Sequence, residues 1–252
     1  MEYLMQRVHC ALAGTLALSL LLQGCSVTDS ENVKTAGISA AIEVVSTSSD
    51  PNAQAHVSAS LQSGSGINGT DLKLTGGDRL YVTADGQKIP LSESSSPIGT
   101  TYEAWVSSSS THTEYIIGFE REEDTSAPSS TVMLPEPFDI QSMAKETYGF
   151  DEDVDLNWSP SGDNKVSILY TFDCRTESGD NRMFGGLRPS VDDDGHYAMD
   201  LSDVIPDGED PVTACDADVA IQRTQKGQLD PNFGEGGSIK GVQKRTVTFD
   251  VS

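Results

Sequence analysis

The stretch KVSILYTFDC, residues 165–174, places an apolar side chain on every second residue. Val166, Ile168, Tyr170 and Phe172 form the series, and Cys174 continues it. Side chains alternate between the two faces of a β-strand, so this spacing predicts a strand with one face in a core. No stretch after residue 36 shows a sustained 3.6-residue apolar period, and the predicted fold class is therefore all-β.

The same alternation recurs on both sides of this stretch, with turn signals such as Asn68-Gly69 and Asp85-Gly86 between the sets. Short strands with turns at this spacing are typical of a β-sandwich. The clearest further sets are Ile38-Ala40-Ile42, Val57-Ala59-Leu61, Tyr102-Ala104-Val106, Tyr115-Ile117-Phe119, Val154-Leu156-Trp158, Tyr197-Met199-Leu201, Ala217-Val219-Ile221 and Val247-Phe249-Val251.

The segment LPEPF, residues 134–138, is the best candidate for a domain boundary. Its prolines cannot donate to a sheet ladder, and they stiffen a connection. We therefore expect one β-sandwich domain over residues 37–137 and a second over residues 138–252, with the charged and polar segment near residues 120–130 as an exposed loop.

The N-terminal 24 residues have the pattern of a secretory signal peptide. Their apolar run is about 13 residues long, whereas a membrane-spanning helix needs roughly 20. Residues 25–36 are polar and aperiodic, and we expect them to form a tether.

The run Leu22-Gln23-Gly24-Cys25 resembles the lipobox of bacterial lipoproteins, although Gln23 departs from the usual small residue. This resemblance implies cleavage before Cys25 and acylation of that residue, and the following Ser26 implies sorting to the outer membrane. The protein would then be anchored to a membrane by lipid, facing the periplasm or the cell surface. The alternative is an ordinary cleaved signal that happens to contain a cysteine.

Two cysteines, Cys174 and Cys215, remain once Cys10 leaves with the signal and Cys25 is acylated. Each is in phase with the core-facing residues of its strand, so both thiols are predicted to face the core side. In an oxidising compartment this pair predicts one disulfide, closing a loop of roughly 40 residues that contributes about 4 kcal/mol in the chain-entropy model.

Residues 138–252 resemble fibronectin type III and related Ig-like sandwiches through VDLNWSPSG, KVSILYTFDC, GHYAMDLSDV, CDADVAIQRTQKG and RTVTFDV, with Trp158 on an early strand. The first domain shares the rhythm only. The whole chain resembles two-domain bacterial lipoproteins that carry a DPxFGxGGS segment, here residues 230–238. Neither resemblance implies an activity.

The charge balance argues against polyanionic partners. The chain carries 39 Asp and Glu against 16 Lys and Arg, a net charge of −23 that removal of the signal leaves unchanged. Such a chain is repelled by nucleic acids and by anionic head groups, so no direct binding to either is expected.

No catalytic constellation or cofactor site is visible. His56, His112 and His196 stand in separate segments without a second ligand at metal spacing, and no nucleophile elbow or phosphate-binding loop opens a helix. The residues Asp192, Asp193 and Asp194 are a candidate Ca²⁺ site, because Ca²⁺ prefers clustered carboxylate oxygens. The alternative is a solvated turn made by the Asp194-Gly195 pair, and we expect no metal.

The long glycine-rich connection KGQLDPNFGEGGSIKG, residues 226–241, leaves two roles open for Phe233. It is either an exposed aromatic contact or a residue packed beneath its own loop.

These observations favour a non-catalytic binding or structural module of the bacterial cell envelope, with a protein or glycan partner that the sequence does not identify. The alternatives are a calcium-dependent adhesion module and an envelope hydrolase without a recognisable motif. An enzyme needs a pocket with converging ionisable groups of displaced pKa, which a binding module does not.

Overall fold

The computed structural model describes residues 27–252 except 65, 67–68, 97–98, 163–164 and 207. The predicted signal peptide and Cys25 lie outside the described residues. The described chain is all-β, as the alternation predicted, and its helical elements are short: α1 (Leu201–Val204), η1 (Ser30–Asn32) and η2 (Thr35–Gly37).

The strands, in chain order, are β1 (Val27–Asp29), β2 (Ile38–Ser46), β3 (Ala55–Ser63), β4 (Thr70–Lys73), β5 (Arg79–Ala84), β6 (Gln87–Pro90), β7 (Ser92–Ser96), β8 (Gly99–Val106), β9 (Glu114–Glu120), β10 (Ala127–Met133), β11 (Thr147–Tyr148), β12 (Asp153–Asn157), β13 (Lys165–Thr176), β14 (Asn181–Asp192), β15 (His196–Asp200), β16 (Val212–Lys226) and β17 (Gly237–Val251).

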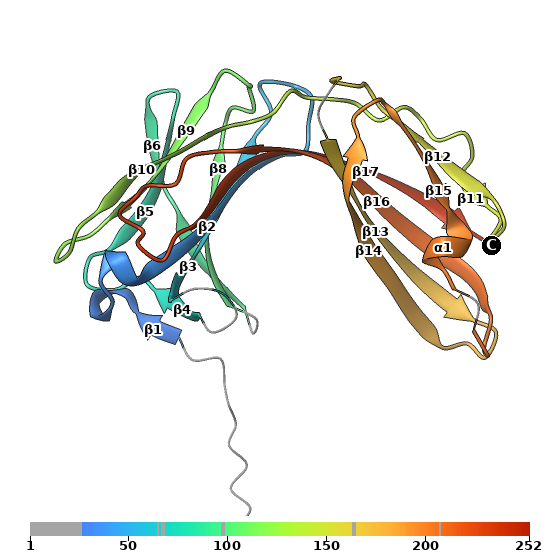
Figure 1. The fold of residues 1–252 in the computed structure, drawn as a ribbon, viewed down its shortest axis with the longest axis horizontal. Coiled ribbons are helices and arrows are strands. Elements are labelled where there is room, and N and C mark those ends of the chain that lie inside the picture. Colours follow the sequence, from blue (N-terminus) through green and yellow to red (C-terminus); the bar gives the residue numbers. More distant parts are fainter. Residues whose placement is uncertain (1–26, 65, 67–68, 97–98, 163–164, 207) are drawn as a thin grey trace, which may run out of the picture.

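One large sheet runs through the whole molecule. Its path is β1-β4-β3-β2-β17-β16-β13-β14, with β8 beside β3, β7 beside β8, and β11 beside β17. Figure 1 shows the result as an arch of two lobes, with the sheet continuous over the top. The first lobe contains β1 to β10, and the second contains β11 to β16.

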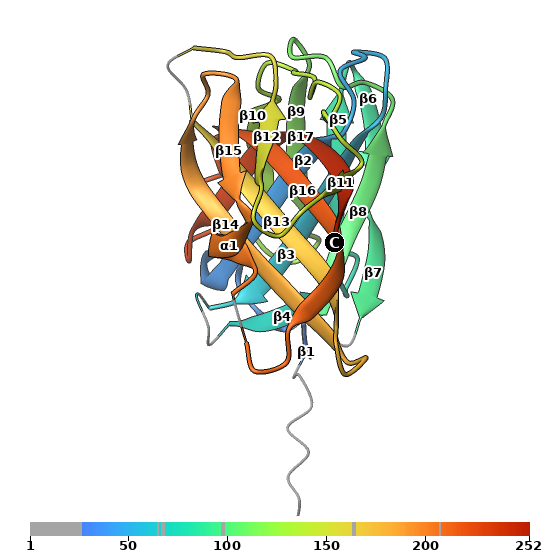
Figure 2. The same ribbon diagram turned by 90° about the vertical axis from the view of Figure 1, so that its right-hand side faces the viewer.

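Each lobe has a second layer on its outer side. A four-stranded sheet, β10-β9-β5-β6, covers the first lobe, while the second is covered by the pair β12-β15 together with α1. In Figure 2 these elements of the second lobe lie in front of the large sheet. In the described part of the chain no such layer covers the inner side of the arch, and we call this side the open face.

Two hydrophobic cores lie between these layers. The first runs from Ile38 to Leu134 and also takes in Phe233 and Ile239, and the second begins at Phe138. The gap between the cores thus falls at the LPEPF segment. The division into two domains stays a prediction, because β17 contributes side chains to both cores.

The strand β17 joins the lobes. Its first half pairs in parallel with β2, from Gly237 opposite Ala40 to Gln243 opposite Ser46, and residues 240–251 pair antiparallel with β16. The strand therefore completes the sheet of the first lobe although it lies at the end of the chain.

The polar segment at residues 27–36, expected to be a tether, is ordered against the first lobe instead. Strand β1 pairs in parallel with β4, and the side chains of Ser30 and Thr35 are buried. The expectation was wrong for these residues because a buried arginine, Arg121, binds the segment. Arg121 belongs to the segment near residues 120–130, which was expected to be an exposed loop. This segment is also partly buried.

The predicted disulfide between Cys174 and Cys215 is present. The two residues are directly opposite each other on β13 and β16, and both are buried in the second core, as their phase predicted. The bond therefore links two neighbouring strands inside the large sheet.

Candidate functional site

The open face carries most of the large apolar side chains that the structure leaves in contact with solvent. Among the described residues, five large hydrophobic side chains are exposed: Val27, Trp105, Met133, Met183 and Leu187. Trp105, Met183 and Leu187 belong to the large sheet and point to the side opposite its cores. Exposed apolar groups that gather on one face indicate a surface for interaction.

Trp105 is the most prominent of these groups in the first lobe. Along β8, Tyr102, Ala104 and Val106 are buried in the first core. Trp105 lies between the last two of these residues and therefore points to the opposite side of the sheet, the open face. Its side chain is 59% exposed. The sequence could have indicated this exposed residue, because the tryptophan stands out of phase with the alternating apolar set Tyr102-Ala104-Val106.

Polar side chains hold Trp105 in place and surround it. His56 lies directly opposite on β3, and the two rings are 4.6 Å apart with an interplanar angle of 40°. The carboxylate of Glu103 lies 3.6 Å from His56 Nε2 and accepts a hydrogen bond of 3.1 Å from Thr101 Oγ1. By register, Ser58 and Ser92 flank Glu103 on the two neighbouring strands.

The face continues from this site towards the middle of the arch. Val45 lies opposite His56, and Val242 lies opposite Val45. Val242 is buried although it belongs to neither core, so its neighbours on the inner side of the bend enclose it. Next to it, Lys240 forms an ion pair of 3.0 Å with Glu43.

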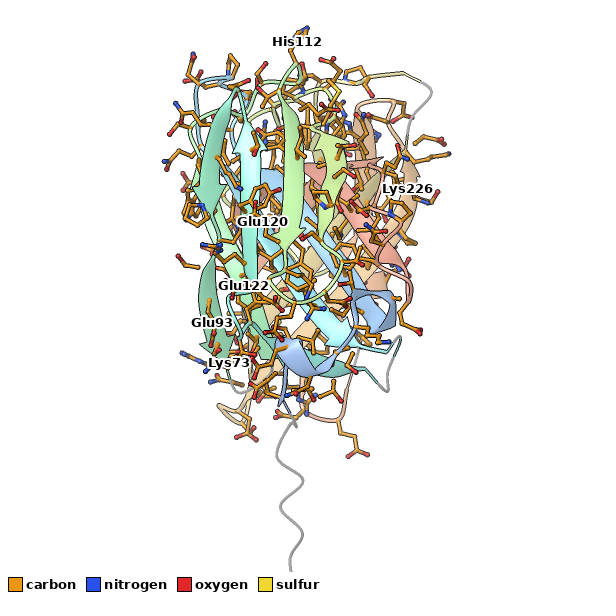
Figure 3. All side chains as sticks on the ribbon, turned by 90° about the vertical axis from the view of Figure 1, so that its left-hand side faces the viewer. Lys73, Glu93, His112, Glu120, Glu122 and Lys226 are labelled. Carbon is orange, nitrogen blue, oxygen red and sulfur yellow. A yellow bond between two sulfur atoms is a disulfide. The ribbon has the colours of Figure 1, made fainter. Side chains whose placement is uncertain are left out.

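The outer side of the first lobe has a different character. Figure 3 shows Glu120 and Glu122 on that side, and Glu120 forms an exposed ion pair of 2.6 Å with Lys88. Exposed pairs of this kind contribute little to stability and leave the outer side charged, without, among the described residues, a large exposed aromatic group like Trp105. The contrast supports the open face as the candidate site.

The structure does not bring the three candidate calcium ligands together. Asp192 pairs with Lys165 at the surface, and Asp194 accepts a hydrogen bond from the backbone of His196. Asp193 is buried and points the other way. In the described part of the chain, no three His, Cys, Asp or Glu side chains are grouped as metal ligands.

Asp193 instead holds the second lobe together. It accepts hydrogen bonds from Trp158 Nε1 at 2.7 Å, from Ser161, and from Arg223 Nε at 2.7 Å. Burial acts to raise the pKa of Asp193, but these hydrogen bonds and the charge of Arg223 outweigh it and hold the pKa below its ordinary value. Arg223 also donates to the backbone oxygens of Glu136, Pro137 and Ser159, so it fixes the segment between the lobes.

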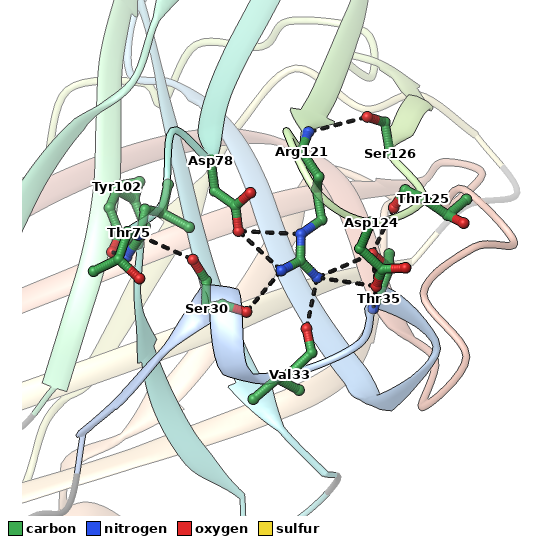
Figure 4. A network of polar contacts seen from close by, with 11 residues as sticks. Ser30, Val33, Thr35, Thr75, Asp78, Tyr102, Arg121, Asp124, Thr125 and Ser126 are labelled. Atoms are coloured by element: carbon green, nitrogen blue, oxygen red, sulfur yellow. Dashed lines mark hydrogen bonds and ion pairs between the residues drawn. The ribbon is translucent and has the colours of Figure 1, made fainter.

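A second buried arginine holds the first lobe together, and Figure 4 shows its contacts. Arg121 forms an ion pair of 3.0 Å with Asp78 and donates to the backbone oxygens of Ser30 and Val33, both at 2.7 Å. Asp124 joins the network, and the hydrogen bond from the backbone of Thr35 is the main cause of its lowered pKa. Charged residues read as a solvated loop in the sequence, so this network was missed.

Phe233 is buried, but beneath more than its own loop. Its ring stacks against Phe119 of the first core, with centroids 6.1 Å apart. Asp230, in the same connection, is also buried and accepts hydrogen bonds from the backbone and side chain of Ser129. The glycine-rich connection thus docks on the first lobe.

An acidic row crosses the open face of the second lobe. Asp173, Asp216 and Asp250 are directly opposite one another on β13, β16 and β17. A hollow of about 650 Å³ beside them is lined by Asp216, Asp250, Lys145 and other residues. Directly opposed like charges are unfavourable. The row therefore makes this end of the open face acidic.

Comparisons with known proteins leave the chain without a family. No protein-family model matches it, and no curated protein matches it. A search of solved structures finds SGBP-B of the mixed-linkage glucan utilization locus of Bacteroides ovatus, in complex with a mixed-linkage heptasaccharide, at 9% identity and a TM-score of 0.21. The match covers 90% of this chain and 65% of that one. A similarity of this size carries no inference.

Across residues 27–252, as far as they are described, no helix has the length and apolar character needed to cross a bilayer.

Proposed function

We propose that this protein is a lipid-anchored, non-catalytic binding module of the bacterial cell envelope that binds a neutral glycan on the open face at Trp105. The observation that carries the proposal is the exposed indole of Trp105, which lies against His56 on the open face and is bordered by Glu103.

The chemistry of a sugar ring fits these groups. One face of a pyranose presents C–H groups that stack on an indole, and its rim presents hydroxyl groups that need hydrogen-bond partners. Trp105 supplies the apolar plane, which a tryptophan offers at small cost in conformational entropy. Glu103, Thr101 and Ser92 supply acceptors and donors on the same face.

The charge around Trp105 favours a neutral ligand. Glu103 lies beside His56, and Glu43 is paired with Lys240, so the acidic groups of this region have basic neighbours. The net charge of −23 repels anionic polymers.

The ionisable groups of the molecule support a binding role over catalysis. The carboxyl groups whose pKa is lowered, including Asp124, Asp193 and Asp210, each accept hydrogen bonds from fixed neighbours. Their displaced pKa values thus have structural causes, and none of these residues lies beside Trp105.

The two tryptophans of the chain make a direct binding test. Trp158 is buried and donates to Asp193, so a change in fluorescence on adding sugar reports on Trp105. We expect at least one of cellohexaose, laminarihexaose and chitohexaose to give a saturable change, and a calorimetric titration of Trp105→Ala with the same sugar to show no binding. No saturable change with any of the three sugars, or an unchanged titration in Trp105→Ala, would contradict the glycan proposal.

A matched control uses the other exposed apolar groups. Met133→Ala removes an exposed side chain from the covering sheet and should leave the titration unchanged. Loss of binding in this variant would place the ligand away from Trp105.

The anchor has its own test. In Cys25→Ser, metabolic labelling with a fatty acid should be lost, and the chain should stay uncleaved or be released from the membrane. Normal labelling in this variant would contradict the lipoprotein proposal.

A further inference from the structure

The strand β14 ends the large sheet with a long free edge. It is 12 residues long and pairs with β13 only. Two residues of β14 that point to the open face of the arch are exposed, Met183 at 72% and Leu187 at 52%. No charged residue and no proline lies between them.

Four of the other edge strands, β1, β6, β7 and β10, carry features that discourage pairing. β7 has the polar sequence SESSS, and β6 is four residues long with Lys88 and Pro90. β1 is three residues long, and β10 is bridged by Gln228. Short, charged or proline-containing edges are how sheets avoid unwanted pairing. β14 lacks these features over residues 183–187.

The disulfide shows which backbone groups of β14 are free. Cys174 and Cys215 are directly opposite, with Cα atoms 4.0 Å apart. A separation this short marks a non-hydrogen-bonded pair, so the N–H and C=O of Cys174 point away from β16 and towards β14. Arg182, which lies opposite Cys174 on β14, therefore points its own backbone groups towards β13.

Backbone groups alternate along a strand, so those of Met183, Gly185 and Leu187 point to the free edge. Among the described residues, no hydrogen bond joins these groups to another element on that side. The same residues therefore present both unpaired backbone groups and, in two cases, exposed apolar side chains.

We propose that β14 pairs antiparallel with β14 of a second copy of this chain, about a two-fold axis at Gly185. In this register Met183 of each copy lies opposite Leu187 of the other, so each exposed apolar side chain gains an apolar neighbour. The three facing residues of each copy form about six backbone hydrogen bonds across the axis. An isologous contact of this kind closes after two copies.

This register places like charges opposite each other, and acidic groups of each copy reduce the resulting repulsion. Arg182 and Arg188 lie opposite each other across the axis, on the side away from the open face. Each has acidic groups on its own copy, since Asp210 interacts with Arg182 and Asp203 with Arg188. Pro189 has no backbone N–H, and it ends the paired stretch.

The test places cysteines at the two positions that the axis brings together. In Met183→Cys/Leu187→Cys, residue 183 lies opposite residue 187 of the other copy, whereas the two are about 13 Å apart along one strand. With the full chain in intact cells, a short bifunctional maleimide should give a covalent dimer in the double variant. The single variants Met183→Cys and Leu187→Cys are the controls and should give none.

A second measurement checks the association without cysteines. The purified chain in detergent should sediment as a dimer, and Leu187→Lys should weaken the association about tenfold or more. Met133→Lys, on the bridged β10, should leave it unchanged.

Three results would overturn the proposal. They are a monomer at every concentration with no cross-link, equal cross-linking of the single variants, and cross-linking of the double variant to a different envelope protein. None of these results bears on the titration at Trp105, so this inference and the glycan proposal fail separately.

Discussion

A buried arginine side chain holds each lobe of this protein, Arg121 in the first and Arg223 in the second, and the two hold different parts of the chain. Arg121 fixes the segment by which the chain enters the first lobe, and Arg223 fixes the connection between the lobes. The first lobe has a four-stranded covering sheet, whereas the second has two strands and a short helix. The lobe with the smaller cover is the one with the disulfide, which indicates that a cross-link supplements a smaller second layer.

The largest expected effect comes from removing either arginine. Arg223→Met leaves Asp193 buried without its partner, and Arg121→Met does the same to Asp78. We expect each variant to lose about 3–5 kcal/mol of unfolding free energy, measured by urea denaturation. Arg223→Met should also change the emission of Trp158, which shares Asp193, while Arg121→Met should not.

The exposed Arg79 provides the control, and Arg79→Met should stay within about 0.5 kcal/mol of the unsubstituted protein. Because β17 belongs to both lobes, each variant should unfold in one transition. Two separate transitions in Arg121→Met would show that the lobes unfold independently.

The disulfide has the next largest expected effect. Cys174→Ala/Cys215→Ala releases a loop with a sequence separation of 41 residues, and about 2–4 kcal/mol of stability should be lost. Thermal melts with and without reductant are the measurement. Reductant should lower the melting temperature of the unsubstituted protein and leave the double variant unchanged, and a native protein insensitive to complete reduction would contradict this prediction.

The smallest expected effect is a loss of stability at high pH that originates in the first lobe. Burial, more than any other cause, raises the pKa of Tyr102 and Tyr115, both in the first lobe. A raised pKa in the folded state means stability that is present below about pH 10 and is lost as the pH rises further. Stability should therefore fall above pH 10.

Tyr115→Phe tests this prediction. The change removes the hydrogen bond from Tyr115 to the backbone oxygen of Ser108, at a cost of about 1 kcal/mol at neutral pH. It should also make the alkaline loss of stability shallower in urea titrations at pH 9 to 11. An equally steep loss in the variant would assign the alkaline sensitivity to other groups.

Alternation in the sequence predicted the features that depend on neighbouring residues. It predicted the all-β class, the buried face of the strands that contain the alternating sets, and the phase that brings Cys174 and Cys215 together. It did not predict the parallel pairing of β17 with β2, because no local pattern records a partner about 200 residues away. Asp193 shows the same limit, since its neighbours Asp192 and Asp194 are solvated and only the remote Trp158 and Arg223 make it an interior residue.

The position of β17 also sets an order of assembly for a chain that is synthesised from its N-terminus. Until the last 16 residues arrive, β2 has one vacant side, and Arg245 cannot reach the backbone oxygen of Ser46, 199 residues earlier. Contacts so distant in sequence form slowly, and the unfinished sheet is exposed to proteases and to wrong partners meanwhile. Without β17 neither lobe is complete, so the assembly of both lobes depends on this one strand.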